Sequence, residues 1–431
     1  MSFNRELNNF LKNLEALEIF IETQTKVINP LDKEGLIGEK EIDGTITVLE
    51  TISDMISKIK GKKENAGEKL DIIQPDNPKV EVLESIGVSL TQNENGSIQL
   101  SFSDKNLADT FNKAVKWSDL TNRQTELVYR NSLISLMMYF ENLISGIIKR
   151  RLKLFPDSFN PNDKTIKYSE LLEFENLSDA LEYLIDNEVV KIMYGGFKDW
   201  IAYIKKSGVE LKKVEFLSEA INEAHNRRNL FVHNDGIVNN IYLKKVSKEF
   251  IDGLEKGKPI NITNEYIIKA IDNVKKYGTL LLFEAWKTYQ GSEKDKRLDY
   301  CEKLAYEFLI GEKWDLAKVL YEFIYDEISS YGDKTRAQIN IWLCQKQLGD
   351  FDAIKAEIEK FDASALQTKY HLCISSILEE NDKFYELLDK EPYAISEESL
   401  KEWPVLSYVR NDERMQKYLN KNNTENEIVY S

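Results

Sequence analysis

Hydrophobic residues recur at spacings of three and four along most of the chain, which is the pattern of helices with one buried face. The strongest such stripe ends in a basic run, and its inward positions are Leu133, Met137, Phe140, Ile144 and Ile147. Similar stripes predict helices over residues 4–28, 46–59, 176–194, 211–233 and 264–289. The sequence therefore predicts a mainly α fold.

Two short segments near the N-terminus have a different pattern. Residues 80–90 and 97–102 are candidate strands, and the polar turn 93–96 between them contains the Asn-Gly pair typical of a hairpin. A loop is expected over residues 61–79. We therefore interpret residues 1–106 as an accessory α/β region. A second pair of strands is expected at 237–246 and 259–263, after a helix that stops at Asp235-Gly236.

The pattern changes again after Gly291, where short apolar helices alternate with short turns. Three similar turns place Trp314, Phe351 and Phe384 near the start of the next helix, at separations of 37 and 33 residues. This period is similar to the roughly 34 residues of tetratricopeptide hairpins, although the full consensus is absent. We expect residues 291–431 to form a stack of helical hairpins that offers a binding groove for a protein partner or trigger, or a dimer surface.

Composition and charge narrow the class of protein. The 431 residues are 42% hydrophobic with 8 Pro and 19 Gly, which excludes disordered and low-complexity classes. The net charge of −15 argues against an RNA-coating protein but allows a local basic patch. The widely spaced Cys301, Cys344 and Cys373 are expected to be reduced core residues of a cytoplasmic protein. No signal peptide or membrane span is recognisable.

Candidate chemistry is concentrated in one window, since two of only three histidines, His225 and His233, lie there. The window contains Arg228-Asn229-x-x-x-His233, which resembles the Arg-(Asn/Asp)-x-x-x-His motif of HEPN domains. The resemblance covers about residues 107–290. It implies a HEPN-type helical bundle, and many such bundles are metal-independent endoribonucleases that act as dimers. The expected fold is thus this bundle, with the small N-terminal α/β piece and the C-terminal helical-hairpin repeats on either side.

These residue types suit RNA cleavage without a metal. The reaction needs a proton removed from the ribose 2′-hydroxyl, a proton given to the departing 5′-oxygen, and stabilisation of a phosphorane. An imidazole can transfer either proton near neutral pH, so His233 is expected to be the general acid or base. A guanidinium offers a planar fork of donors to phosphate, so Arg228 is expected to hold the negative charge.

Helix geometry limits how the motif can work. Asn229 and His233 are one turn apart and share a face, so Asn229 could orient the imidazole. Arg228 and His233 are about 140° apart around a helix of 3.6 residues per turn. They could meet through the length of the arginine, through unwinding at the helix end, or across a two-fold axis. The family resemblance implies the last, with a homodimer as the active form.

Other residues could support the site, and each also has a plain structural interpretation. His225 and Glu141 could contact Arg228, or they could be a core histidine and a solvated carboxylate. Asn229 and His233 could simply hydrogen-bond each other or the backbone. A basic rim could attract RNA, or it could be ordinary solvated surface; its candidate residues are Lys149, Arg150, Arg151 and Arg227. His371 is expected to be structural.

The sequence thus predicts a metal-independent endoribonuclease without a cofactor, and the resemblance suggests a regulated toxin or an antiviral-defence effector. A non-catalytic HEPN-type assembly module is the alternative, and a nucleotide-binding regulatory subunit is a third interpretation. There is no phosphate-binding glycine loop, dinucleotide fingerprint or serine-hydrolase elbow. His371 and Cys373 lack the further close ligands that a zinc site needs.

Overall fold

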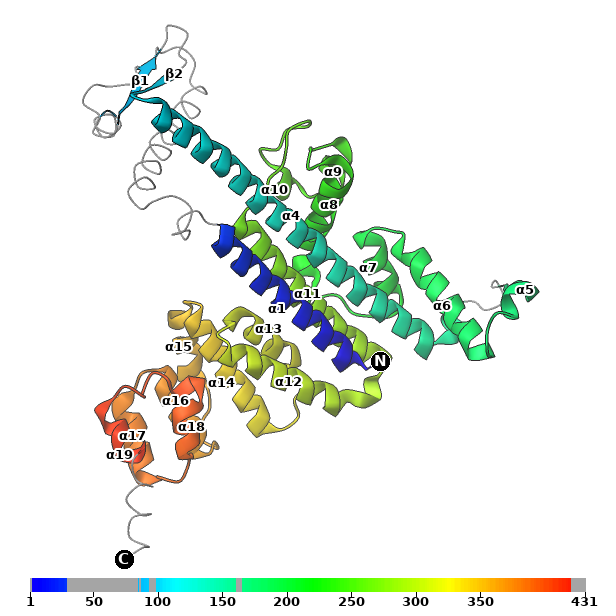
Figure 1. Ribbon diagram of the computed structural model, residues 1–431. Helices are drawn as coiled ribbons and strands as arrows, with labels where there is room; N and C mark the ends of the chain where they lie inside the picture. The colour runs from blue at the N-terminus through cyan, green and yellow to red at the C-terminus, as the bar shows by residue number, and fades with distance from the viewer. Residues whose placement is uncertain (1, 29–83, 85–86, 93–97, 160–164, 420–431) are drawn as a thin grey trace, which may run out of the picture.

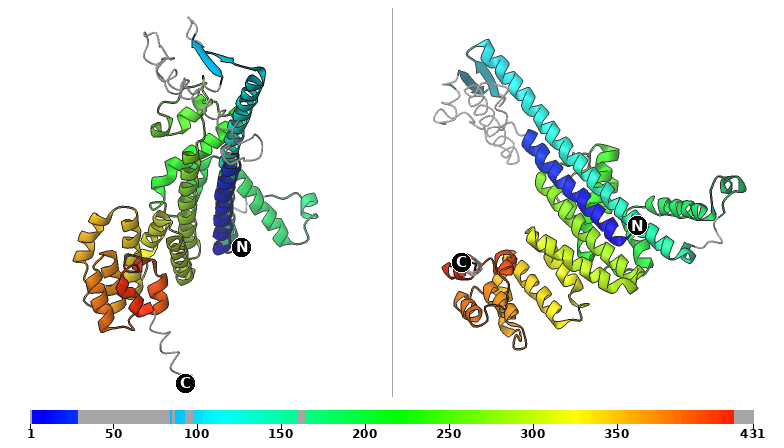
Figure 2. Two further views of the ribbon diagram at one scale, coloured as in Figure 1. Left: turned by 60° about the vertical axis from the view of Figure 1, so that its left-hand side comes forward. Right: turned by 60° about the horizontal axis from the view of Figure 1, so that its bottom comes forward.

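The computed structural model describes residues 2–28, 84, 87–92, 98–159 and 165–419, and most of them are helical. Its central element is the 50-residue helix α4 (Lys105–Leu154). Helices α1 (Phe3–Ile28) and α11 (Asn264–Tyr289) lie alongside it, as Figures 1 and 2 show. The mainly α class is confirmed.

The apolar stripes form the common core of these three helices. All five inward positions predicted on α4 are buried, and so are most apolar side chains along the stripes of α1 and α11. Val27 and Ile268 are exceptions, since both side chains are exposed. Gly278 of α11 allows close packing, because a Cβ atom there would lie 2.7 Å from the ring of Phe10 and 2.8 Å from Leu143.

Helix α1 is part of the bundle core. Phe3 stacks on Trp286 with the ring centroids 5.5 Å apart, and the ammonium of Lys275 is 2.6 Å from the carboxylate of Glu18. Part of the expected accessory region 1–106 therefore belongs to the bundle, because its first helix packs against α4 and α11. Sequence periodicity identified the helix but carried no signal of where it docks.

The predicted N-terminal hairpin is present. Strands β1 (Val88–Gln92) and β2 (Ile98–Phe102) pair antiparallel, with Val88 opposite Phe102, at the far end of α4 (Figure 1). The predicted helix 46–59, the loop 61–79 and the turn 93–96 lie outside the described residues.

The motif helix is α8 (Ser218–Asn234), which packs between α4 and α11. The other described elements before the hairpin stack are α5 (Tyr168–Leu171), α6 (Leu177–Met193), α7 (Phe197–Lys206), α9 (Asn240–Lys245), α10 (Lys248–Ile251), and the 3-10 turns η2 (Pro156–Phe159), η4 (Glu215–Leu217) and η5 (Gly291–Glu293). The expected strands 237–246 and 259–263 are wrong. A single bridge joins Ile237 to Pro259, and Asn239 instead caps α9 with its side chain.

The C-terminal part consists of stacked helical hairpins. The pairs are α12 (Lys294–Ile310) with α13 (Trp314–Tyr325), α14 (Tyr331–Gln347) with α15 (Phe351–Lys360), and α16 (Thr368–Ile377) with α17 (Asn381–Lys390). They are followed by α18 (Glu397–Glu402), η6 (Pro404–Leu406), η7 (Glu413–Met415) and α19 (Gln416–Leu419). The first helices begin at Lys294, Tyr331 and Thr368, at intervals of 37 residues.

The three predicted turns share one backbone geometry. Glu312, Gly349 and Glu379 all have positive φ angles, of 57°, 97° and 59°. In each turn the next amide donates to the carbonyl five residues earlier, as Lys313 does to Phe308 at 2.9 Å. These are the bonds of a left-handed helix termination. The similarity seen in the sequence therefore reflects one repeated stop signal.

Candidate functional site

The end of α8 is fixed by a tight turn. Asp235 has a φ of 49° and Gly236 a φ of 75°, and the Gly236 amide donates to the Leu230 carbonyl at 3.2 Å. A Cβ atom on Gly236 would lie 2.6 Å from the Phe231 ring. The predicted stop at Asp235-Gly236 is confirmed, because both backbone conformation and packing require glycine at 236.

Arg130 of α4 stabilises the same turn through its guanidinium. Its guanidinium donates to the Asp235 carboxylate at 2.7 Å and to the Phe231 carbonyl at 2.8 Å, and it lies 5.4 Å from the centre of the Phe231 ring. These contacts satisfy one of the free carbonyls at the helix end and fix the last turn, on which His233 lies. Sequence reasoning missed Arg130, since nothing in its local pattern indicates a contact more than 100 residues away.

Arg228 points toward α4, where its guanidinium forms an ion pair with Glu141. The two side chains are 19% and 27% exposed, so water only partly screens the charges. Burial lowers the pKa of Arg228 from its ordinary value. Its Nε–H is buried and has no hydrogen-bond partner among the described residues. The expected contact between Glu141 and Arg228 is therefore present, and one donor of the fork remains uncommitted.

His225 is the third member of this group. Its Nε2 lies 3.7 Å from the same carboxylate of Glu141, and its ring packs edge-on against Trp200 with centroids 5.0 Å apart. Burial, with a smaller contribution from Lys245, lowers the pKa of His225 to about 4. The imidazole is therefore neutral at pH 7. His225 is a core histidine that also lies beside the carboxylate that binds Arg228.

His233 and Asn229 project differently from Arg228. Both residues lie within the regular part of α8, so the 140° separation between Arg228 and His233 is retained. The His233 side chain is exposed, and neither it nor Asn229 makes a side-chain hydrogen bond to any residue in the described part of the chain. One chain alone does not bring Arg228 and His233 together.

Arg227, which was expected at the RNA-binding rim, is engaged in contacts within the bundle. Its Nε donates to Glu223 at 2.6 Å, and its guanidinium stacks 3.9 Å from the Tyr266 ring. The phenols of Tyr242 and Tyr266 also donate to Glu223, at 2.6 and 2.7 Å. Because the two charged side chains are only 11% and 2% exposed, this is an internal ion pair with its hydrogen bonds satisfied.

The other three basic residues expected at the RNA rim are also engaged elsewhere. Lys149 pairs with Asp186 at 2.5 Å, Arg150 pairs with Glu6 at 3.1 Å, and Arg151 stacks 3.9 Å from the Phe155 ring. They lie eight to ten residues beyond Glu141, or roughly 12–15 Å along α4 at 1.5 Å per residue. They fasten α4 to α6, α1 and the segment after α4, so this expectation is not supported either.

No cluster of three or more His, Cys, Asp or Glu side chains that could hold a metal ion occurs among the described residues. Cys301, Cys344 and Cys373 are buried free thiols, as expected, and burial raises their pKa values. No helix in the described ranges combines the length and apolarity needed to cross a membrane.

Comparison with protein-family models, curated proteins and solved structures finds no match to this chain.

Proposed function

We propose that the chain is a metal-independent endoribonuclease of HEPN type that acts as a homodimer on an RNA substrate. The proposal rests on the surroundings of two side chains of α8, those of Arg228 and His233. Arg228 has an Nε–H without a partner in the part of the chain that the structure describes, and His233 is exposed on a helix end fixed by Arg130. A cation and a proton-transfer group are thus both held on one rigid element, as this chemistry requires.

In the proposed reaction, the Arg228 guanidinium binds a phosphate oxygen and stabilises the extra charge of the phosphorane. The His233 imidazole removes the proton of the 2′-hydroxyl or protonates the departing 5′-oxygen. Asn229 shares the His233 face and is free to hydrogen-bond the substrate or the imidazole. The products would carry 2′,3′-cyclic phosphate and 5′-hydroxyl ends.

A second copy is part of the mechanism for a geometric reason. The two side chains leave α8 in directions 140° apart and are separated by five residues, or roughly 7.5 Å of helix rise. Two α8 ends related by a two-fold axis would bring Arg228 of one protomer near His233 of its partner. Such a composite site would also supply two imidazoles, one as acid and one as base.

Glu141 would set the resting state of this site. Its carboxylate pairs with one nitrogen of the Arg228 guanidinium that a phosphate would need, so RNA must share or displace it. Regulation of this kind agrees with the toxin or antiviral-effector role that the family resemblance suggests, and the reduced cysteines favour a cytoplasmic location.

The alternative is a non-catalytic HEPN-type module for assembly or partner binding. The ion pairs of Lys149, Arg150 and Arg227 favour it, since none of these cations is left to attract RNA. The acidic net charge of −15 points the same way.

The deciding experiment incubates purified protein with total RNA in EDTA. The enzyme hypothesis expects cleavage that leaves cyclic phosphate ends and is lost in His233→Ala and in Arg228→Ala. Arg228→Lys should lose most of the activity, because an ammonium lacks the bidentate fork. His371→Ala, on α16, is the matched histidine control and should cleave normally.

A resting effector could be inactive when purified, so growth on expression in cells is the second readout. Growth arrest that His233→Ala relieves and His371→Ala does not would support catalysis. Equal arrest by all forms would favour the assembly module. A monomer by light scattering, both at rest and during cleavage, would exclude the composite site.

A further inference from the structure

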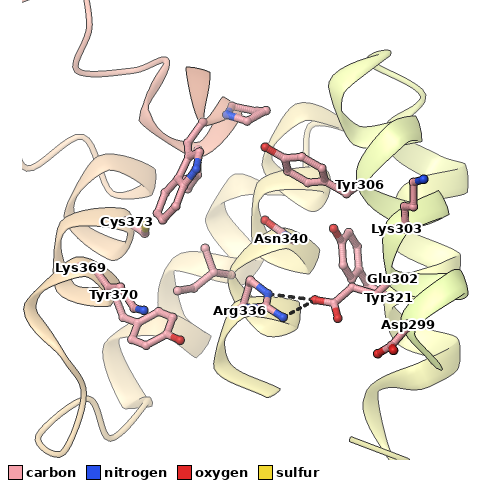
Figure 3. Close-up of a pocket in the computed structure, with 14 residues that line it drawn as sticks. Asp299, Glu302, Lys303, Tyr306, Tyr321, Arg336, Asn340, Lys369, Tyr370 and Cys373 are labelled. Carbon is pink, nitrogen blue, oxygen red and sulfur yellow. Dashed lines mark hydrogen bonds and ion pairs between the residues drawn. The ribbon is translucent and has the colours of Figure 1, made fainter. Parts of the chain in front are cut away.

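The hairpin stack contains a groove of about 550 Å³ on the side formed by the first helices (Figure 3). Tyr306 of α12, Asn340 of α14 and Tyr370 of α16 line it from three successive hairpins, and Trp403 lines it from the segment before η6. Cavities of 300–1,000 Å³ with aromatic walls and a few polar groups are typical of binding sites.

The two cations Arg336 and Lys369, which line the groove, differ in whether a described carboxylate pairs with them. Arg336 is paired with Glu302, at 2.7 Å, and with Asp333, at 3.0 Å. On the opposite wall, the Lys369 ammonium lies 5.1 Å from the centre of the Tyr370 ring and forms no ion pair with a described residue. The groove therefore offers aromatic surface and one uncompensated cation. A polyphosphate is disfavoured, since the carboxylates of Asp299 and Glu302 line the same space.

The chain itself contains a segment with the complementary chemistry. Residues 420–431 follow α19 and lie outside the described part of the chain. Their sequence has eight polar positions, 420–427, which include Glu425 and Glu427, and then the apolar trio Ile428-Val429-Tyr430. Burying this trio against aromatic walls is favourable at roughly 25 cal/mol per Å² of apolar surface. Either glutamate could pair with Lys369.

The segment is long enough to reach the groove. Helix α18 contacts both α19 and η6, and η6 contacts α14 and α16, which line the groove. With about 8–10 Å between packed elements, the end of α19 is roughly 20 Å from the groove. Eight extended residues span up to ~26–29 Å. A tether of this length gives an effective concentration in the millimolar range, so even a weak contact would be occupied within one chain.

We propose that Ile428, Val429 and Tyr430 bind in the groove of the same chain, with an adjacent glutamate beside Lys369. The groove is then occupied by the chain's own segment, and an external partner must compete with it. The proposal does not depend on the nuclease hypothesis.

Photocrosslinking in the full chain tests the occupant directly. Tyr430 is replaced by benzoylphenylalanine, and the crosslinked peptides are identified by mass spectrometry. We expect crosslinks to residues 299–306, 336–340, 369–373 or 403–405, on a species of monomer mass whose yield does not depend on protein concentration. Crosslinks only elsewhere would overturn the site. Species of dimer mass would overturn binding within one chain.

Competition provides the second test, again with the full chain. A fluorescent peptide of residues 420–431 is titrated with wild type and with the variant Ile428→Ser, Val429→Ser, Tyr430→Ser. We expect at least tenfold tighter binding to the variant, whose own segment no longer fills the groove. Adding Lys369→Glu should weaken this binding at least threefold, whereas Lys355→Glu, exposed on α15, should not. Equal affinity for wild type and variant, or for a scrambled peptide, would refute the proposal.

Discussion

Arg228 and Glu141 are 87 residues apart in the sequence, yet their side chains form an ion pair that joins α8 to α4. Both groups are partly buried, so removing one partner leaves the other incompletely solvated. The contact therefore links the stability of the bundle to the state of the proposed site.

A double-mutant cycle tests this link. We expect Glu141→Gln and Arg228→Gln each to lower the free energy of unfolding by about 1–3 kcal/mol, with a coupling energy of about 1–2 kcal/mol. Urea denaturation is the measurement. Glu126→Gln, at an exposed position on α4, is the control and should change stability by less than about 0.5 kcal/mol. Strictly additive single effects would show that the ion pair contributes nothing.

The Arg227–Glu223 pair should behave as a structural element. We expect Arg227→Ala to lower the free energy of unfolding by about 3–5 kcal/mol, because Glu223 would remain buried without its cation. Binding of single-stranded RNA by the folded protein should be unchanged when measured below the unfolding transition. A mutant of wild-type stability that binds RNA more weakly would instead restore the RNA-contact interpretation.

His225 predicts a specific pH dependence of stability. Burial lowers its pKa to about 4, whereas in the unfolded chain it is near the ordinary 6.5. Between these pH values the unfolded state binds the extra proton, so stability falls as the pH falls from about 6.5 toward 4. For this shift we expect a loss of about 2 kcal/mol between pH 7.5 and pH 5.

The control for this prediction is His225→Phe, which keeps an aromatic ring beside Trp200 but cannot be protonated. Urea midpoints at the two pH values should show the extra loss in wild type and not in the variant. If both proteins lose the same stability, other groups cause the pH dependence.

Gly236 and Gly253 form a matched pair in the segment between α8 and α11. Their φ angles are 75° and 74°, but a Cβ atom would contact the Phe231 ring only at 236 and nothing within 4 Å at 253. We expect Gly253→Ala to lower the free energy of unfolding by about 1 kcal/mol and Gly236→Ala by about 2–4 kcal/mol. Thermal melts measure both. If the enzyme hypothesis holds, only Gly236→Ala should also reduce RNA cleavage, since the turn fixes His233.

Much of the local structure could be predicted from the sequence. The stripes on α1, α4 and α11 predicted long helices because apolar side chains at spacings of three and four must share one face. The Asp235-Gly236 stop was predicted because left-handed backbone geometry favours glycine, whereas the three repeated turns were predicted from the spacing of Trp314, Phe351 and Phe384. The strands predicted after residue 236 were wrong, because apolar content alone does not separate a short strand from the short helix α9.

The sequence by itself determined which helices form, where most of them stop, and that Arg228 and His233 leave α8 in different directions, since these properties follow from backbone geometry within one element. Only the tertiary structure decided which charges are available. Packing paired Arg228 with Glu141 and Arg130 with Asp235, in the turn that follows His233, and it buried the local pair Arg227–Glu223. Long-range partners of this kind have no local signature, because the free energy of a buried ion pair depends on the elements that enclose it.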